Sequence, residues 1–150
     1  VVLVQPDSPF YNIAFEASIS ASSEYAQADQ LASKAIDGVI DGYPGDSSRE
    51  WSTEGEGVGA WLELNWPGIY LINRIILYDR PNAHDHITSA TITFNDETTL
   101  SIGLLGNDGS GVEYVFAQKS ISNLILTVEG TANTPTNIGL AEIEVFGVPQ

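Results

Sequence analysis

The sequence contains no cysteine and no long hydrophobic run. Without cysteine, the chain has no disulfide framework, no zinc–thiolate site and no thiol nucleophile. This absence does not by itself fix the cellular compartment. No run of about eighteen apolar residues occurs, so no segment is predicted to span a membrane as a helix.

Basic residues are also scarce: 20 acids stand against five cations, and the formal net charge is −15. Such a chain repels phosphate backbones, so a nucleic-acid-binding role is disfavoured, and so is attachment to anionic membranes. The ordinary explanation for this acidity is solubility outside the cell, which predicts a secreted protein. A sharper interpretation is a preference for neutral or cationic ligands.

Motifs for the common catalytic chemistries are missing. The sequence has no nucleophile elbow, no phosphate-binding glycine loop and no dinucleotide fingerprint. Paired carboxylates are easily found by chance in so acidic a chain, so they carry little weight. The sequence therefore predicts a protein that is not an enzyme.

Short apolar stretches separated by turn signals run along the chain and predict an all-β sandwich or barrel. The expected strands cover residues 12–21, 60–66, 70–78, 89–94, 98–104, 112–116, 122–129 and 140–146. Residues 1–11 are predicted to be a lead-in or linker because Pro6 and Pro9 interrupt any strand, and residues 12–150 to form one domain. Asp29 is expected to cap a short helical turn over residues 30–34. The tryptophans Trp51, Trp61 and Trp66 are expected in the core.

The loop between Ala35 and Trp51 is rich in aspartate, glycine and serine but is bounded by apolar residues. It therefore predicts a structured loop. Calcium prefers six to eight oxygen ligands, and this loop offers several within a short span. The oxygen-bearing candidates are Asp37, Asp41, Asp46, Ser47 and Ser48. The alternative is that Asp37 and Asp41 only cap Asp-Gly turns.

Five short segments, in order, resemble the discoidin or coagulation factor 5/8 type C superfamily. They are Asn12-Ile13-Ala14 leading to Ser20–Ser23, Lys34–Gly38 followed by Trp51-Ser52, Ala60–Leu64, Ile72–Ile75, and Gly139–Gly147. Within this superfamily the chain looks most like family 32 carbohydrate-binding modules. The resemblance implies an eight-stranded galactose-binding-like jelly roll.

The resemblance also implies a structural calcium ion. Carried over to this chain, its side-chain ligands would be Asp37 and Glu142, joined by backbone oxygens of Lys34 and Ala141. The loop here is longer than the family's, so Asp41, Asp46, Ser47 and Ser48 stay open as further ligands.

In family 32-like modules the sugar binds loops at one end of the sandwich, and the loop after the Ile72–Ile75 strand commonly takes part. Arginine and asparagine supply planar forks of donors, and aspartate supplies strong acceptors, as sugar hydroxyls require. The candidates in this loop are Arg80, Asn82, His84, Asp85 and His86. Tyr25 or Tyr43 could supply an aromatic platform, and Glu54 and Glu56 could reach the same rim.

Two alternatives exist for the same loop. The His84-Asp85-His86 triplet could bind zinc or copper, although such sites usually need a third strong ligand. The loop could instead be solvated, with Asp79 and Arg80 paired to each other.

The sequence therefore predicts a calcium-stabilised, non-catalytic carbohydrate-binding domain, either a lectin or a module of a secreted glycan-active enzyme. Galactose-type or other neutral sugars are the expected ligands, with a cationic chitosan-like polymer as the rival that the charge suggests. The partners would be a glycan and, by tethering or assembly, a catalytic domain or further copies of the chain. The alternative is a protein-interaction, adhesion or structural accessory domain without sugar binding.

Overall fold

The computed structural model describes residues 10–40 and 45–150, and this part of the chain is built from strands and short 3₁₀ helices. The strands are β1 (Tyr11–Asn12), β2 (Ser18–Ala21), β3 (Trp51–Ser52), β4 (Trp61–Tyr78), β5 (Ile87–Phe94), β6 (Thr99–Ile102), β7 (Gly111–Thr131), β8 (Gly139–Leu140) and β9 (Glu142–Pro149). The helices are η1 (Ala14–Glu16), η2 (Ala26–Ala28), η3 (Ala32–Ile36) and η4 (Ser47–Arg49).

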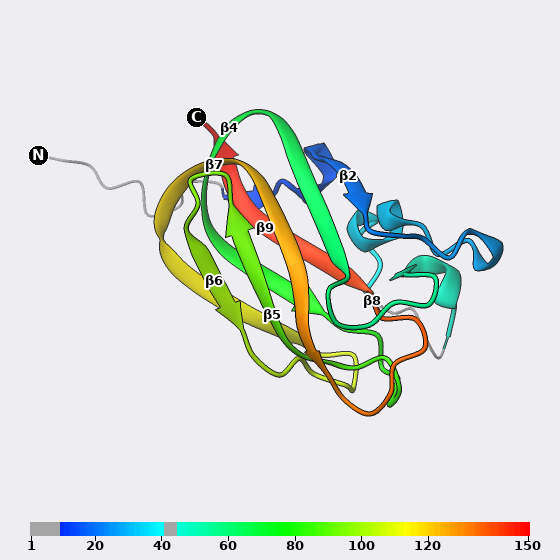
Figure 1. The fold of residues 1–150 in the computed structure, drawn as a ribbon. Helices are drawn as coiled ribbons and strands as arrows, with labels where there is room; N and C mark the ends of the chain where they lie inside the picture. The colour runs from blue at the N-terminus through cyan, green and yellow to red at the C-terminus, as the bar shows by residue number, and fades with distance from the viewer. Residues whose placement is uncertain (1–9, 41–44) are drawn as a thin grey trace, which may run out of the picture.

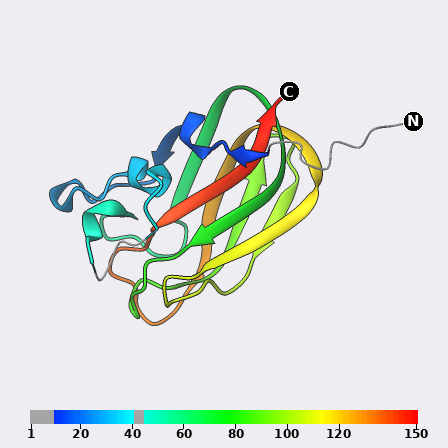
Figure 2. The same ribbon diagram turned by 180° about the vertical axis from the view of Figure 1, so that it is seen from behind.

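Two long strands, β4 and β7, bend and run through both layers of a sandwich (Figure 1). The first layer consists of β2, the first part of β4, the second part of β7, β5 and β6. The second layer consists of β1, β9, the rest of β4 and the first part of β7, and it faces the viewer in Figure 2. The predicted all-β sandwich of the galactose-binding-like type is confirmed.

The strand boundaries differ from those predicted at three places. The strand expected over residues 12–21 is interrupted by η1, so that β1 ends at Asn12 and β2 covers only Ser18–Ala21. Pro67-Gly68 signals a break, yet β4 continues through it, with a register shift between Asn65 and Tyr70 that bends the strand. Likewise the two expected strands at residues 112–116 and 122–129 are parts of β7. The described residues therefore form nine strands, several of them very short, where the resemblance implied eight.

The core follows the alternation of strand residues. In β4, Leu62, Leu64 and Trp66 point inward and are buried. Trp51 is completely buried and its indole Nε1 donates to the Ser23 carbonyl, so its predicted core position is confirmed, as is that of Trp66. The prediction for Trp61 is wrong: it alternates with the inward residues and stays partly exposed on the outer face.

The outer face of the first layer carries mostly hydroxyl and amide side chains, which occupy the outward positions of five strands. We call it the hydroxyl face, and it consists of Ser18, Ser20, Trp61, Glu63, Asn65, Thr91, Thr93, Thr99, Ser101, Asn123, Ile125 and Thr127.

The connection from β2 to β3 is made of short 3₁₀ turns. Asp29 does not begin the expected helical turn: it ends η2 in the left-handed conformation (φ 58°), and its carboxylate pairs with Lys34 Nζ at 3.2 Å. The helical turn itself is η3, which starts two residues later than expected and has no side-chain cap. Within the described residues, no helix has the length and apolar character needed to cross a bilayer.

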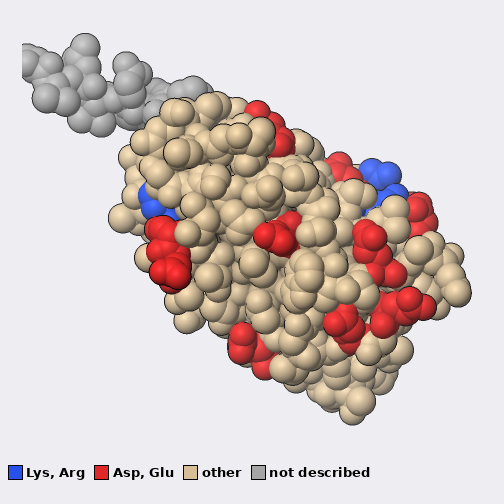
Figure 3. Space-filling view, turned by 45° about the horizontal axis from the view of Figure 1, so that its top comes forward, with Lys and Arg blue, Asp and Glu red and all other residues tan. Residues whose placement is uncertain are grey.

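On the face seen in Figure 3, acidic side chains are scattered and basic ones are few. Several of the basic residues are already committed to carboxylates: Arg74 pairs with Glu113 at 3.0 Å and Arg49 lies 3.4 Å from Asp37. The surface therefore offers little positive charge to an anionic partner.

Three connections meet at one end of the sandwich, at the lower right in Figure 1. They join β3 to β4, β4 to β5 and β7 to β8. We call this region the loop end. It contains most of the polar residues that the sequence singles out as sugar ligands.

Candidate functional site at the loop end

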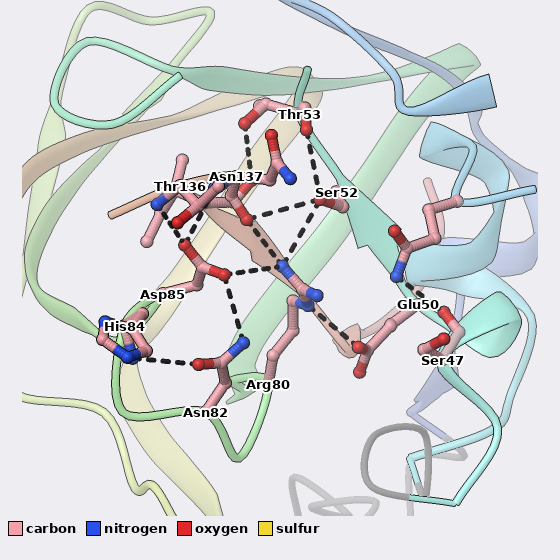
Figure 4. A network of polar contacts seen from close by, with 12 residues as sticks. Ser47, Glu50, Ser52, Thr53, Arg80, Asn82, His84, Asp85, Thr136 and Asn137 are labelled. Carbon is pink, nitrogen blue, oxygen red and sulfur yellow. Dashed lines mark hydrogen bonds and ion pairs between the residues drawn. The ribbon is translucent and has the colours of Figure 1, made fainter. Parts of the chain in front are cut away.

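Arg80 lies directly after β4 and stands at the centre of the loop end (Figure 4). Its Nε donates to Glu50 Oε1 at 2.8 Å, and its Nη1 donates to the Asn137 carbonyl at 2.6 Å. Nη1 also lies 3.5 Å from Asp85 Oδ2. The Arg80 side chain is 7% exposed and that of Glu50 is fully buried. A buried guanidinium therefore connects the β4–β5 loop to the β7–β8 loop and to the segment between η4 and β3.

Asp85 is the second junction of this network. Its Oδ1 accepts from the backbone N–H groups of Thr136 and Asn137, at 2.8 and 2.9 Å. Its Oδ2 accepts from Asn82 Nδ2 at 3.1 Å, and Asn82 Oδ1 in turn accepts from the His84 N–H. These bonds hold the β4–β5 loop against the β7–β8 loop and fix its shape.

Asp79 closes the base of the β4–β5 loop. Its two carboxylate oxygens accept from the N–H groups of Arg80 and Ile87, at 2.8 and 2.7 Å. Burial raises the pKa of this carboxyl to about 8, against the opposing effect of the two N–H donors and the Arg80 charge. The prediction of a solvated loop with an Asp79–Arg80 ion pair is wrong, because both residues are buried and the guanidinium pairs with Glu50 and Asp85.

Above this network the loop end exposes a rim of polar side chains. His84 and Glu54 are exposed, and Asn133 Nδ2 donates to the Ala83 carbonyl at 2.8 Å, which holds the backbone beside His84. The Gly55 N–H donates to Asn137 Oδ1 at 2.7 Å, so the loop that carries Glu54 is tied to the same frame.

The remaining sugar candidates lie less centrally. His86 is half-buried, and its Nε2 donates to the Leu105 carbonyl at 2.7 Å. Tyr25 is half-buried in the turn before η2, and its N–H donates to the Ser52 carbonyl. Glu56 accepts from Ser23 Oγ at 2.5 Å. Tyr43 lies outside the described residues.

The structure thus brings Arg80, Asn82, His84 and Asp85 together, but these residues have different roles. Arg80 and Asp85 form the buried frame, while His84 faces solvent. Two members of the frame, Glu50 and Asn137, were not singled out by the sequence. Glu50 stands between Arg49 and Trp51 in a polar stretch, and nothing in that local pattern distinguishes a buried glutamate from a solvated one.

Asp37 and Glu142 form a second polar site, between the end of η3 and the start of β9. Glu142 is fully buried; its Oε2 accepts from the Gly38 N–H at 2.8 Å, and its Oε1 is buried with no hydrogen-bond partner. Asp37 Oδ2 is likewise buried without a hydrogen bond, with Arg49 Nε at 3.4 Å. Burial, followed by the Asp37 charge, raises the pKa of Glu142 to about 9. Two carboxylates with orphaned oxygens fit a hard cation.

The other candidate ligands occupy separate roles. Asp46 Oδ1 accepts from the N–H and hydroxyl of Ser48 and so caps η4, while the Ser47 carbonyl accepts from Gln30 Nε2 at 2.9 Å. The Lys34 carbonyl accepts from the Asp37 N–H, and the Ala141 N–H donates to the Tyr78 carbonyl. Asp41 lies outside the described residues.

A search of residues 10–40 and 45–150 finds no set of three or more His, Cys, Asp or Glu side chains placed to hold a metal ion. Asp37 and Glu142 are only a pair, so carbonyl oxygens or water would have to supply the rest of any calcium shell there. The zinc or copper alternative would need the ring nitrogens of His84 and His86. Nε2 of His86 is already hydrogen-bonded to the Leu105 carbonyl.

The fold is a galactose-binding-like β-sandwich, and this chain shares it with the solved structures described below. The sequence profile of the DUF7402 family, described as a domain of unknown function, matches residues 12–146, and the chain belongs to this family. No curated protein matches the chain.

Solved structures with the same fold are carbohydrate-binding proteins by name. The fucolectin of striped bass (Morone saxatilis) serum has a TM-score of 0.78 at 16% identity; the match covers 93% of this chain and half of that one. The family 32 module of Clostridium perfringens NanJ, solved with galactose, has a TM-score of 0.70 at 20% sequence identity. The match covers 91% of this chain and 98% of that one. The chitosan-binding module 1 of a Paenibacillus sp. IK-5 chitosanase/glucanase has a TM-score of 0.68 at 21% sequence identity. The match covers 92% of this chain and 99% of that one.

Proposed function

We propose that this domain binds carbohydrate at the loop end, without catalysis, and that a calcium ion at Asp37 and Glu142 stabilises it. The observation that carries the proposal is the buried Arg80–Glu50–Asp85 network, which joins the β4–β5 loop to the β7–β8 loop and to the segment before β3, beneath an exposed polar rim. The Gly55–Asn137 bond ties the β3–β4 loop to the same frame. A site made of preformed loops suits a sugar, because little ordering entropy is lost when the ligand binds.

In this mechanism the exposed side chains of the rim make the contacts, and the buried ones hold them in place. His84 offers ring nitrogens, and Glu54 offers strong acceptors for hydroxyl protons. Arg80 and Asp85 act as positioning residues, since their polar atoms are used between the loops. A shallow site of this kind predicts modest affinity, so that several copies or a tether would raise avidity.

Neutral sugars of the galactose type are the proposed ligands, and the acidic surface favours a chitosan-like polymer as the second choice. Two of the similar structures bear on this choice, because one was solved with galactose and another is named as chitosan-binding. Secretion is part of the same proposal, since such glycans lie outside the cell.

The proposal is tested with a glycan array that includes chitosan oligomers, probed in calcium and again in chelator. We expect binding to a neutral sugar that weakens in chelator and is lost in His84→Ala but kept in Gln118→Ala, an exposed polar control in β7. Binding to chitosan would weaken with salt, whereas binding to a neutral sugar would hardly change.

The contrary result is a blank array in both conditions from a sample whose circular dichroism and cooperative melting show it to be folded. That result would move the assignment to an interaction or structural domain, which a defined oligomer in sedimentation would support.

A further inference from the structure

Two shallow hollows lie on the hydroxyl face of the first layer. The first, about 210 Å³, is lined by Ser18, Ile19, Ser20, Glu63 and Asn65. The second, about 280 Å³, is lined by Glu16, Ser18, Asn65, Trp66 and Pro67. It shares Ser18 and Asn65 with the first, so the two adjoin at the edge of the hydroxyl face. Neither is lined by any residue of the Arg80 network.

The strand register places the outward side chains of this face in rows across the sheet. One row contains Ser20, Glu63, Ile125, Thr93 and Thr99, which are successive Cα partners on β2, β4, β7, β5 and β6. Directly paired outward residues lie about 4.5–5.5 Å apart at Cβ, so each row is a continuous line of side chains.

The neighbouring rows have the same character. Trp61, Thr127, Thr91 and Ser101 form one of them, and Ser18, Asn65 and Asn123 form the other. Asn123 Nδ2 donates to Glu63 Oε2 at 2.7 Å, which holds the only ionisable side chain of the three rows in a fixed position. From Trp61 to Asn65 the face extends about 13–14 Å along β4, at the usual rise per strand residue.

The scarcity of charge on this face contrasts with the rest of the chain. The whole sequence has 20 acidic residues, yet the twelve outward positions hold one, Glu63, and no lysine or arginine. Two further acids border the face: Glu129 is exposed near the end of β7, and Glu16 lines the second hollow. The face is therefore weakly acidic and mostly made of uncharged polar groups. Hydroxyl and amide groups both donate and accept, which matches the hydroxyl groups of a neutral sugar chain.

We propose that the hydroxyl face is a second binding surface, for a neutral polysaccharide chain that lies across β2, β4 and β7. Trp61 supplies a partly exposed indole for stacking on the apolar side of a sugar ring. Ser18, Ser20 and Asn65 line the first hollow on the same face and supply hydrogen bonds. This surface is separate from the loop end and needs several linked sugars, whereas the rim accepts a single terminal one.

Other occupants fit the face less well. The large exposed apolar side chains of the described residues all lie elsewhere, so the face lacks the apolar centre of a protein interface. Because the twelve positions of this face carry no cation, it offers no charge to neutralise the phosphates of a nucleic acid.

Affinity electrophoresis in gels containing galactan, β-glucan or xyloglucan tests this surface. We expect at least one polymer to retard the protein, and Trp61→Ala to weaken the apparent affinity about tenfold or more, as loss of an aromatic anchor does. The matched control is Phe146→Ala, a partly buried aromatic on the outer side of the second layer, which should leave retardation unchanged.

A second variant covers the case in which Trp61→Ala fails to fold. Ser20→Arg fills the hollow from an exposed position, and Ser33→Arg adds the same charge and bulk to an exposed position on η3. Ser20→Arg should lose retardation while Ser33→Arg keeps it.

The test separates this surface from the loop end. His84→Ala should abolish binding of short terminal sugars and leave polymer retardation in place. The inference is overturned if no polymer retards the wild type, if both face variants run like it, or if retardation disappears in His84→Ala alone. A concentration-dependent dimer that Ser20→Arg abolishes would assign the face to a second copy and would also overturn it.

Discussion

Two sites in this molecule each bring two carboxylates together, and they differ in the positive charge that the chain supplies. Glu50 and Asp85 are buried at the first site, whereas at the second Glu142 is buried and Asp37 is partly exposed. At the loop end Glu50 and Asp85 flank the guanidinium of Arg80, and every distance in that set is 3.5 Å or less. Between η3 and β9, Asp37 and Glu142 each keep a buried oxygen without a hydrogen bond. The chain supplies the cation at the first site, so that site is complete in the protein alone. At the second site, the ion pair found among the described residues joins Asp37 to the partly exposed Arg49 at 3.4 Å, and the proposed calcium ion would add further positive charge.

The largest effect is expected from removing the cation of the first site. Arg80→Ala leaves Glu50 and Asp85 buried without their partner, which should lower the free energy of unfolding by about 3–5 kcal/mol in urea titrations. Arg74→Ala removes an exposed guanidinium paired with Glu113 and is the control, with a loss of about 1 kcal/mol or less. Equal losses in the two variants would show that the buried network contributes no more to the free energy of unfolding than an exposed ion pair does.

The second effect concerns calcium. At a calcium concentration 100 times its Kd, binding to the folded state should add about 2.7 kcal/mol of stability, seen as a rise in Tm. Glu142→Gln and Asp37→Asn should lose this rise. If calcium raises the Tm of Glu142→Gln as much as that of the wild type, the ion binds elsewhere.

A third prediction uses the raised pKa of Asp79. The folded pKa is about 8 against an ordinary value of 3.8, so between these values the folded state holds a proton that the unfolded chain has released. Stability should therefore fall as pH rises through this range. Asp79→Asn should flatten that slope in urea titrations between pH 5 and 9, run in saturating calcium. An unchanged slope would assign the pH dependence to other groups.

The smallest effect is expected at Asp46. Its carboxylate caps η4 through two contacts with Ser48, so Asp46→Ala should lower the Tm slightly and leave the rise in calcium intact. Loss of the calcium response in this variant would add Asp46 to the ligand set.

Much of the fold could be predicted from the sequence because alternation encodes which side of a strand is buried. Leu62, Leu64 and Trp66 alternate with Trp61, Glu63 and Asn65, and the structure buries the first set. The same pattern places Trp61 beside two polar residues, so its position outside the core could have been predicted from the alternation rather than from residue type.

The candidate site was less predictable. The sequence shows that Arg80 and Asp85 lie in one loop, but their partners Glu50 and Asn137 come from loops 30 and 57 residues away from Arg80. Whether a polar residue is a ligand or part of a frame depends on burial, and burial depends on tertiary packing that no local pattern encodes. The continuation of β4 through Pro67-Gly68 was not predictable from the sequence either. This dipeptide signals a turn in any context, and only the pairing with neighbouring strands shows that it bends a strand instead of ending it.

The most direct test of carbohydrate binding at the loop end is a titration followed by NMR, with ¹⁵N-labelled protein and a short neutral sugar selected on the array. The account predicts that amide shifts concentrate at residues 53–57, 82–86 and 133–137 and saturate at one site, while those of β9 stay in place. Saturable binding whose shifts avoid all three loops would contradict it, and so would the absence of any shift with every sugar tried.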